Sequence, residues 1–234
     1  MTSAVTLERS DHALVCHLDD GKANALSGEM IAAIRRALEE AEDDDEVAAL
    51  VLHGRPGKFC AGFDLGVMLG GDPAAVSDLV CDGGDLVRSF YGAGVPVVAA
   101  CTGHALAAGA LVLLACDVRI GADVDCKIGL NEVAIGMVLP DWALTLAADR
   151  LSKRHLQRAV ATARVTGAGG ATDVGFLDEV VPEDEVLERA LAVAEELAAL
   201  DRRAYAATVR AVRGEVLSTL EEQVAADRAS GSTP

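Results

Sequence analysis

Residues 96–116 read PVVAACTGHALAAGALVLLAC, and this stretch decides the fold. Its start, Pro96–Cys101, is apolar at successive positions, which predicts a strand that is buried on both faces and central in a sheet. The apolar run Ala107–Cys116 predicts a buried helix soon after it. The longer region Ser89–Cys116 lacks Asp, Glu, Lys and Arg and is long enough to cross a bilayer. Because a proline, a histidine and four glycines interrupt it, we expect a strand, a turn and a helix, and no membrane partner.

Strands and helices alternate outward from this stretch, which indicates an α/β fold. Further strands are expected at Val5–Leu7, Ala13–Leu18, Val47–His53 and Val118–Ile120. Ser27 is the expected N-cap of a helix that ends near Glu42. After Pro182, amphipathic helices are expected at Glu183–Leu200, Arg202–Arg213 and Glu215–Asp227. We therefore expect a core in residues 1–181 and a helical C-terminal oligomerisation region in residues 182–234.

The composition excludes several classes of partner. The 234 residues carry a formal net charge of −17, which repels nucleic acids and anionic membranes. The six cysteines form no C-x-x-C pair, so a zinc site is not expected, and their apolar surroundings suit reduced thiols. The N-terminal residues show no basic segment followed by an apolar one, so we expect no signal peptide and a cytoplasmic location.

Three segments carry residues suited to chemistry, and each also has an ordinary explanation. In Lys58–Leu65 the small Ala61 and Gly62 would let backbone N–H groups face a cavity, although an ordinary loop is the alternative. In Cys101–Leu111 a helix of small residues begins, and its N-terminal N–H groups would suit a developing oxyanion. Tight packing of that helix on the sheet is the alternative, and the one favoured for this segment alone.

The third segment, Ile128–Gly136, contains the lone carboxylate Glu132 in an apolar stretch. Burial would raise the pKa of Glu132 and suit it to moving a proton. A surface glutamate on a loop is the alternative explanation.

In this order and spacing, the three segments resemble the crotonase (enoyl-CoA hydratase/isomerase) superfamily. The resemblance includes Asn24-Ala25-Leu26 and Gly175–Val181, and it extends from about Ala4 to the C-terminal helices. It implies a spiral of ββα units, an acyl-CoA substrate, and assembly into a homotrimer or a dimer of trimers. It implies no separate cofactor and no metal, because coenzyme A is part of the substrate.

The resemblance also assigns roles to residues. It implies an oxyanion hole formed by the backbone N–H groups of Phe63 and Ala108, with Glu132 as the catalytic acid and base. The residues that it places at the substrate are Lys22, Ala25, Lys58, Ala61, Asp64, Leu65, Leu111 and Asp141. Lys22 and Lys58, together with Arg55, are candidate contacts for the phosphates of coenzyme A, and solvated surface charge is the alternative.

Leu111 departs from the family pattern, because typical hydratases carry a glutamate at this position. A chain that keeps only Glu132 is similar to Δ3,Δ2-enoyl-CoA isomerases, so isomerisation of an unsaturated fatty acyl-CoA is the favoured activity. Two alternatives stay open. One is an enoyl-CoA hydratase, a lyase that uses Glu132 with Asp141 or water. The other is an acyl-CoA-binding protein without catalytic activity.

Overall fold

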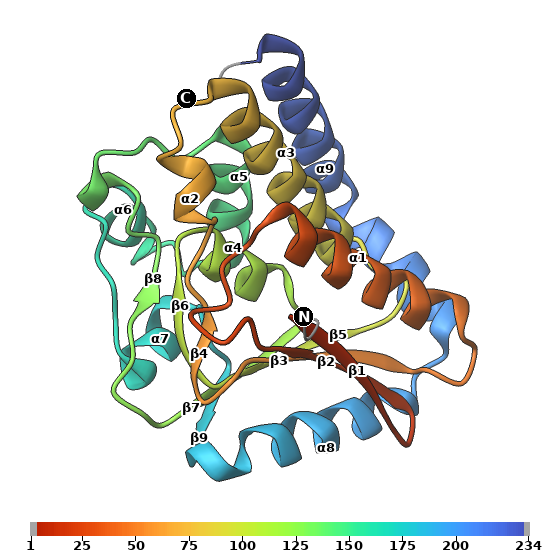
Figure 1. The fold of residues 1–234 in the computed structure, drawn as a ribbon. Coiled ribbons are helices and arrows are strands. Elements are labelled where there is room, and N and C mark those ends of the chain that lie inside the picture. The colour runs from red at the N-terminus through yellow and green to blue at the C-terminus, as the bar shows by residue number, and fades with distance from the viewer. Residues whose placement is uncertain (1–3, 232–234) are drawn as a thin grey trace.

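The computed structural model describes residues 4–231, and two sheets with their covering helices make up the fold (Figure 1). The six-stranded sheet has the order β1-β2-β3-β5-β7-β9, and a three-stranded sheet has the order β4-β6-β8. The strands are β1 Val5–Ser10, β2 Ala13–Leu18, β3 Ala49–His53, β4 Gly57–Cys60, β5 Val97–Cys101, β6 Gly103–Leu106, β7 Val118–Ala122, β8 Ile128–Gly129 and β9 Glu179–Val181. Among the strand pairs of residues 4–231, only β1–β2 is antiparallel. The predicted α/β class is confirmed.

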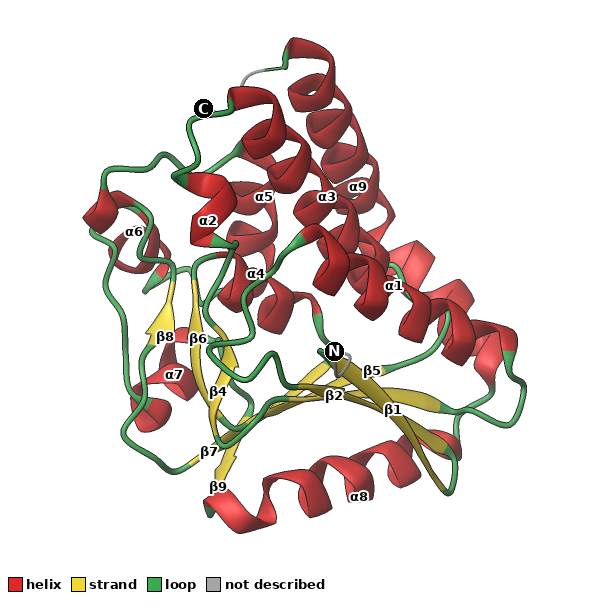
Figure 2. Cartoon of the chain, in the orientation of Figure 1, coloured by secondary structure: helices red, strands yellow, loops and turns green. Residues whose placement is uncertain are grey.

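Helices cover both faces of the larger sheet (Figure 2). The helices are α1 Gly28–Asp43, α2 Leu65–Met68, α3 Pro73–Tyr91, α4 Ala108–Ala115, α5 Asp141–Arg150, α6 Leu156–Val160, α7 Ala168–Val174, α8 Val186–Ala198 and α9 Arg202–Ser230, with 3-10 turns η1 Val133–Ile135 and η2 Glu183–Glu185. Helix α8 covers one face, where Val186 and Ala190 pack against side chains such as Val51 and Val98. The opposite face joins the main core with α1, α3 and α4.

The central strand behaves as its sequence predicts. All five residues of β5 are buried, and β5 lies between β3 and β7 in the six-stranded sheet. Ser27 caps α1 as expected, since its side chain accepts a hydrogen bond from the Met30 N–H at 3.2 Å. Among residues 4–231, no helix combines the length and the apolar character that a membrane span requires.

The C-terminal helices differ from the prediction. The segments Arg202–Arg213 and Glu215–Asp227 are one continuous helix, α9, so the expected break at Gly214 is wrong. A helical glycine costs only about 1 kcal/mol relative to alanine, and the packing of α9 along α3 and α5 outweighs that cost. Both α8 and α9 pack on the rest of the chain, and the division at residue 181 stays a prediction.

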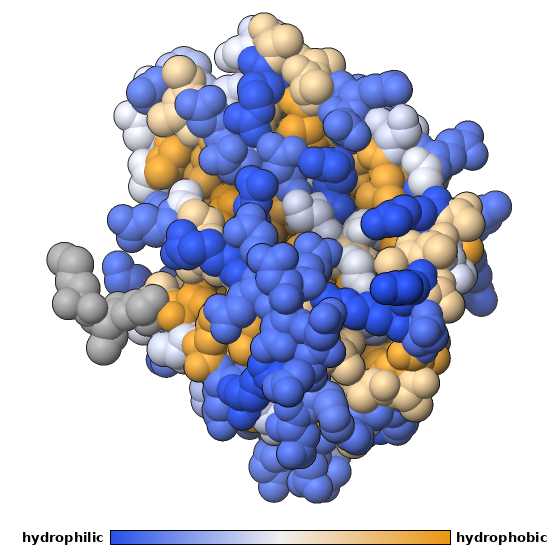
Figure 3. Space-filling view, turned by 90° about the vertical axis from the view of Figure 1, so that its right-hand side faces the viewer, coloured by the Kyte–Doolittle hydropathy of each residue, from blue (hydrophilic) through white to orange (hydrophobic). Residues whose placement is uncertain are grey.

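One side of the molecule is mainly hydrophilic. Figure 3 shows the side of the molecule that lies to the right in Figure 1, and hydrophilic residues cover most of this face. Hydrophobic residues appear there as separate patches between the hydrophilic ones. This face therefore presents a mainly solvated surface.

The spiral repeat brings the three chemical segments to one place. Strands β3, β5 and β7 of the larger sheet are each followed by one strand of the smaller sheet, namely β4, β6 or β8. The three short strands are parallel, so their carboxyl ends lie at the same end of the sheet. Ligands of parallel sheets bind just beyond the carboxyl ends of the strands. Residues 61–64 follow β4, residues 107–111 follow β6, and Glu132 follows β8.

Candidate active site

Close backbone contacts join the first two segments. A Cβ atom on Gly109 would lie 2.2 Å from the Cys60 carbonyl oxygen, so only glycine lets α4 approach the end of β4 this closely. A Cβ atom on Gly62 would lie 3.5 Å from the Ala108 nitrogen. The tight-packing explanation of residues 101–111 is therefore correct, and the same packing places Ala108 beside residues 61–63.

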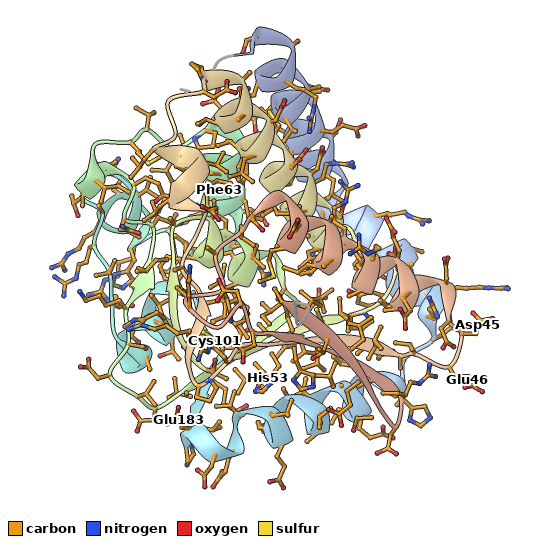
Figure 4. All side chains as sticks on the ribbon, viewed as in Figure 1. Asp45, Glu46, His53, Phe63, Cys101 and Glu183 are labelled. Atoms are coloured by element: carbon orange, nitrogen blue, oxygen red, sulfur yellow. The ribbon has the colours of Figure 1, made fainter. Side chains whose placement is uncertain are left out.

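The Phe63 N–H group is unpaired, and hydrogen bonds of the two neighbouring residues fix its position. The Gly62 carbonyl accepts from the Leu26 N–H at 2.8 Å, and the Asp64 N–H donates to the Leu26 carbonyl at 3.1 Å. Phe63 itself donates no backbone hydrogen bond to any residue in the described range 4–231. Its ring packs on α3, where a Cβ atom on Gly83 would lie 2.5 Å from the ring. Figure 4 shows Phe63 just ahead of α2.

The Ala108 N–H group is free for a different reason. Ala108 is the first residue of α4, so no turn of helix precedes it to supply an acceptor. Ala107, before it, has a φ of 51° and a ψ of −127°, a conformation that costs a non-glycine residue about 1–3 kcal/mol. A hydrogen bond of 3.0 Å from the Ala107 N–H to the Gly129 carbonyl holds this conformation in place. The described part of the chain offers the Ala108 N–H no acceptor.

Glu132 is buried with an unpaired carboxylate oxygen. Its residue is 7% exposed, and Oε2 has no hydrogen-bond partner among the described residues. Removal from water disfavours the charged form and raises the pKa of Glu132 to about 7. The neighbouring Asn131 Oδ1 is also buried without a partner in residues 4–231. The surface-glutamate explanation is wrong, and the group is poised to exchange a proton near neutral pH.

Leu111 lies in the first turn of α4 and is only 2% exposed. Every residue of α4 is buried, and none carries a side chain with a polar oxygen or nitrogen. The start of this helix therefore offers a ligand the Ala108 N–H group and apolar side chains, and no second carboxylate.

Three of the predicted substrate-binding residues lie beside Phe63 in segments that are hydrogen-bonded to each other. Ala25, Ala61 and Asp64 lie in the paired segments, because Ala61 N–H donates to the Ala23 carbonyl at 3.1 Å and Asp64 pairs with Leu26. The Asp64 side chain caps α2 by accepting from the Gly66 N–H, and Leu65 in that helix is 64% exposed.

Lys22 and Lys58 flank the same segments. Lys22 is exposed, and its carbonyl accepts from Arg55 Nη1 at 2.9 Å. Lys58 lies half-buried in β4, opposite His104 of β6. Arg55 also pairs with Asp19 at 3.2 Å. Arg55 thus contacts Lys22 and forms a backbone bridge with Lys58, so the three basic residues lie close together.

Asp141 is not joined to Glu132. It is exposed at the first position of α5, and no hydrogen bond or ion pair between the two is present in residues 4–231. Its charge acts instead on Asp227 of α9, whose pKa is raised by burial and then by Asp141. A direct partnership of the two carboxylates thus has no support from contacts within one chain.

Asn24 is a residue whose role the sequence did not reveal. It is fully buried, with a φ of 53°, and its Nδ2 donates to the Leu18 carbonyl at 2.8 Å and the Phe59 carbonyl at 3.1 Å. It thereby ties residues 23–26 to the end of β4. Asparagine enters this left-handed region several times more often than most residues, which is the only local signal.

Two cavities lie elsewhere. One of about 570 Å³ is lined by residues such as Glu42 and Arg202, and one of about 160 Å³ adjoins α6 and α7. Neither is lined by a residue of the three segments. The assignment of the site therefore rests on the free N–H groups and the buried carboxylate.

Comparison with known proteins identifies the family. Residues 8–232 match the enoyl-CoA hydratase/isomerase family. Mouse mitochondrial enoyl-CoA delta isomerase 1 is 32% identical over 91% of this chain and 74% of its own length, and a putative enoyl-CoA hydratase of Thermus thermophilus is 32% identical over 83% and 77%. The crystal structure of an enoyl-CoA hydratase/isomerase family protein from Pseudomonas syringae has a TM-score of 0.93 at 38% identity and covers 97% of both chains. The chain therefore belongs to the enoyl-CoA hydratase/isomerase family of enzymes, with the crotonase fold that its motifs resemble.

Proposed function

We propose that the protein is a Δ3,Δ2-enoyl-CoA isomerase acting on an unsaturated fatty acyl-CoA. The observation that carries the proposal is one buried, unpaired carboxylate, Glu132, in a site whose second family position is the buried Leu111. Similarity to the mouse mitochondrial enoyl-CoA delta isomerase 1 supports it.

In this mechanism Glu132 removes a proton from C2 of the 3-enoyl thioester. The electron pair moves onto the thioester oxygen, and the resulting enolate lies between the N–H groups of Phe63 and Ala108. Each such donor is worth about 10²–10³ in rate. Glu132 then returns the proton to C4, which forms the 2-enoyl product. One carboxyl with a pKa near 7 serves both steps, because neither its acid nor its base form is strongly favoured at neutral pH.

Hydration is the second candidate. The hydratase name of the Thermus thermophilus relative favours it, and Glu132 would then act with Asp141 or a bound water. Hydration needs a positioned water at C3, and the apolar Leu111 disfavours one at the position where family hydratases carry a glutamate. A pocket that binds acyl-CoA without turnover is the third outcome that the experiment below distinguishes.

The purified protein is expected to isomerise a 3-enoyl-CoA at least tenfold faster, in kcat/KM, than it hydrates crotonyl-CoA. Both reactions are followed optically through the conjugated enoyl thioester. Hydration faster by tenfold or more would reject the isomerase assignment and make Asp141 the first residue to replace. Tight binding of acyl-CoA with neither reaction would establish the non-catalytic binder.

The isomerase rate should depend on pH through Glu132. The ionised carboxylate is the base, and burial raises its pKa from 4.5 to about 7. We therefore expect kcat/KM to fall about tenfold per pH unit below 7 and to level off above it. A profile measured from pH 5.5 to 8.5 that stays flat would contradict Glu132 as the base.

Assembly and location complete the proposal. We expect a homotrimer or a dimer of trimers, with Lys22, Lys58 and Arg55 contacting the phosphates of coenzyme A and no further cofactor. All six cysteines are buried and unpaired, which supports work in the reducing cytoplasm.

The oligomer is tested by light scattering. At micromolar concentration the mass should be three or six times the 24.1 kDa of one chain. A stable particle with the mass of one chain would contradict this expectation.

A further inference from the structure

A basic segment stands out in this acidic chain. Between Arg150 and Asp173 there is no Asp or Glu, while the segment carries Lys153, Arg154, Arg158 and Arg164. None of these four side chains forms an ion pair with a carboxylate in residues 4–231. In a chain of net charge −17, where acidic partners are abundant, a cluster of unpaired cations is left available for an external anion.

Local structure brings two of these residues, Arg158 and Arg164, to the lining of one cavity. Helix α6 ends at Val160, and the chain then turns through Ala163, whose φ of 48° is unusual for alanine. The Arg164 N–H donates to the Arg158 carbonyl at 3.2 Å and closes this turn. Arg158 and Arg164 thereby line the cavity of about 160 Å³ between α6 and α7.

The remaining lining of the cavity is mainly small or polar. His155 and Thr166 provide further polar side chains, Gly170 adds no side chain, and Asp173 is the one carboxylate among the described lining residues. Two arginine forks and a hydroxyl are the donors that bind phosphate oxygens. The volume suits a phosphate or pyrophosphate group.

We infer that this cavity is an anion site that binds a phosphate or pyrophosphate group. The group belongs either to a free phosphate compound or to the diphosphate and 3′-phosphate of coenzyme A. The site adjoins β8, because Thr166 and Ile128 exchange hydrogen bonds of 2.9 and 2.8 Å. Lys58, a predicted contact for coenzyme A phosphates, lies instead in β4 at the other edge of the same sheet.

Its position also links the cavity to the candidate active site. A Cβ atom on Gly129 would lie 3.1 Å from the Val165 Cα atom, so the segment from Arg164 to Thr166 packs directly on β8. The Gly129 carbonyl in turn holds the Ala107 N–H. An anion bound by Arg164 would therefore contact a segment that packs on β8, and β8 is the strand that positions the start of α4.

Titration calorimetry with inorganic pyrophosphate tests the inference in the full-length protein. The double variant Arg158→Gln/Arg164→Gln should weaken binding at least about tenfold, since hydrogen bonds between charged groups are lost. Asp173→Asn should instead tighten binding several-fold by removing a repulsive charge. Arg210→Gln, at an exposed arginine of α9 without an ion pair in the described residues, is the matched control and should change nothing.

Two outcomes would overturn the inference: no pyrophosphate binding to the unmodified protein at millimolar concentration, or equal affinity in the double variant and the control. The source of the phosphate is separated by a second titration with coenzyme A. If coenzyme A competes with pyrophosphate and the double variant raises KM for the enoyl-CoA, the group is part of the substrate. If pyrophosphate binds at the cavity and KM is unchanged, the ligand is a free phosphate compound. Both measurements of binding are independent of the reaction that the enzyme catalyses.

Discussion

Replacing Glu132 by Gln should lower kcat/KM about 10²–10⁴-fold and leave the binding of acyl-CoA nearly unchanged. Glutamine fills the same space but cannot take the proton from C2, while the N–H groups of Phe63 and Ala108 are untouched. Glu183→Gln, at an exposed glutamate of η2, is the control and should retain full activity. Unchanged turnover in Glu132→Gln would remove Glu132 from the mechanism.

The same variant should be more stable than the natural protein above pH 7. The pKa of Glu132 is raised from 4.5 in the unfolded chain to about 7 in the folded one, so folding favours the protonated form. The contribution of this group to stability is thus greatest below pH 4.5 and is lost as the pH rises to 7. Ionised Glu132 costs up to about 3 kcal/mol, which glutamine avoids.

Urea unfolding at pH 4.5 and pH 8 measures this cost directly. The difference in unfolding free energy between Glu132→Gln and the natural protein should grow from near zero at the lower pH to its full value at the higher one. A gain in stability coupled to a loss of turnover indicates a group kept for chemistry. An equal difference at both pH values would show that burial does not perturb this carboxyl.

Introducing the missing acid by Leu111→Glu should raise the hydration of crotonyl-CoA at least about tenfold and lower isomerisation. The new carboxylate would hold water beside C3, in a place where leucine gives water no hydrogen bond. The change puts a polar group in a fully buried helix, so stability should fall by about 1–3 kcal/mol.

Leu111→Gln separates the two effects. It has the size and much of the polarity of glutamate but no proton to exchange, so it should share the stability loss without the gain in hydration. An equal rise in the hydration rate of both variants would mean that a polar side chain at position 111 is enough for hydration and that a carboxylate is not needed. Hydration that rises in neither would mean that position 111 does not set the reaction type.

The longer elements were predictable because their residues repeat a simple pattern. The fully buried β5 and the amphipathic α1 follow directly from apolar runs and 3–4 spacing. Strands β4, β6 and β8 were missed because they have only two to four residues, too few for a pattern to develop. These three strands nevertheless position the site. The sequence therefore identifies the motifs but does not predict the small sheet that brings them together.

Individual residues of the site can be identified from the sequence, but their contacts in the folded protein cannot. Glu132 was found as a lone carboxylate among apolar residues, but its unpaired oxygen is a tertiary property. The role of Asn24 is not predictable from its motif, because its hydrogen bonds to the Leu18 and Phe59 carbonyls depend on strands that are distant in the chain. The place of Asp141 at the substrate stays a prediction, and its charge raises the pKa of the partly buried Asp227 of α9, an effect that the sequence alone does not indicate.

The covering of the larger sheet by α8 has a consequence for biosynthesis. The buried side chains that the strands contribute to this apolar face, such as Val15 and Val51, are all present once β7 has been added, but the cover of the face, α8, begins only at Val186. A nascent chain that has left the ribosome up to β7 therefore exposes an apolar sheet face that is prone to aggregation. Parallel pairing of distant strands is slow, so this interval is prolonged. Chaperones that hold exposed apolar surface would act during this interval, and their task would end when α8 docks.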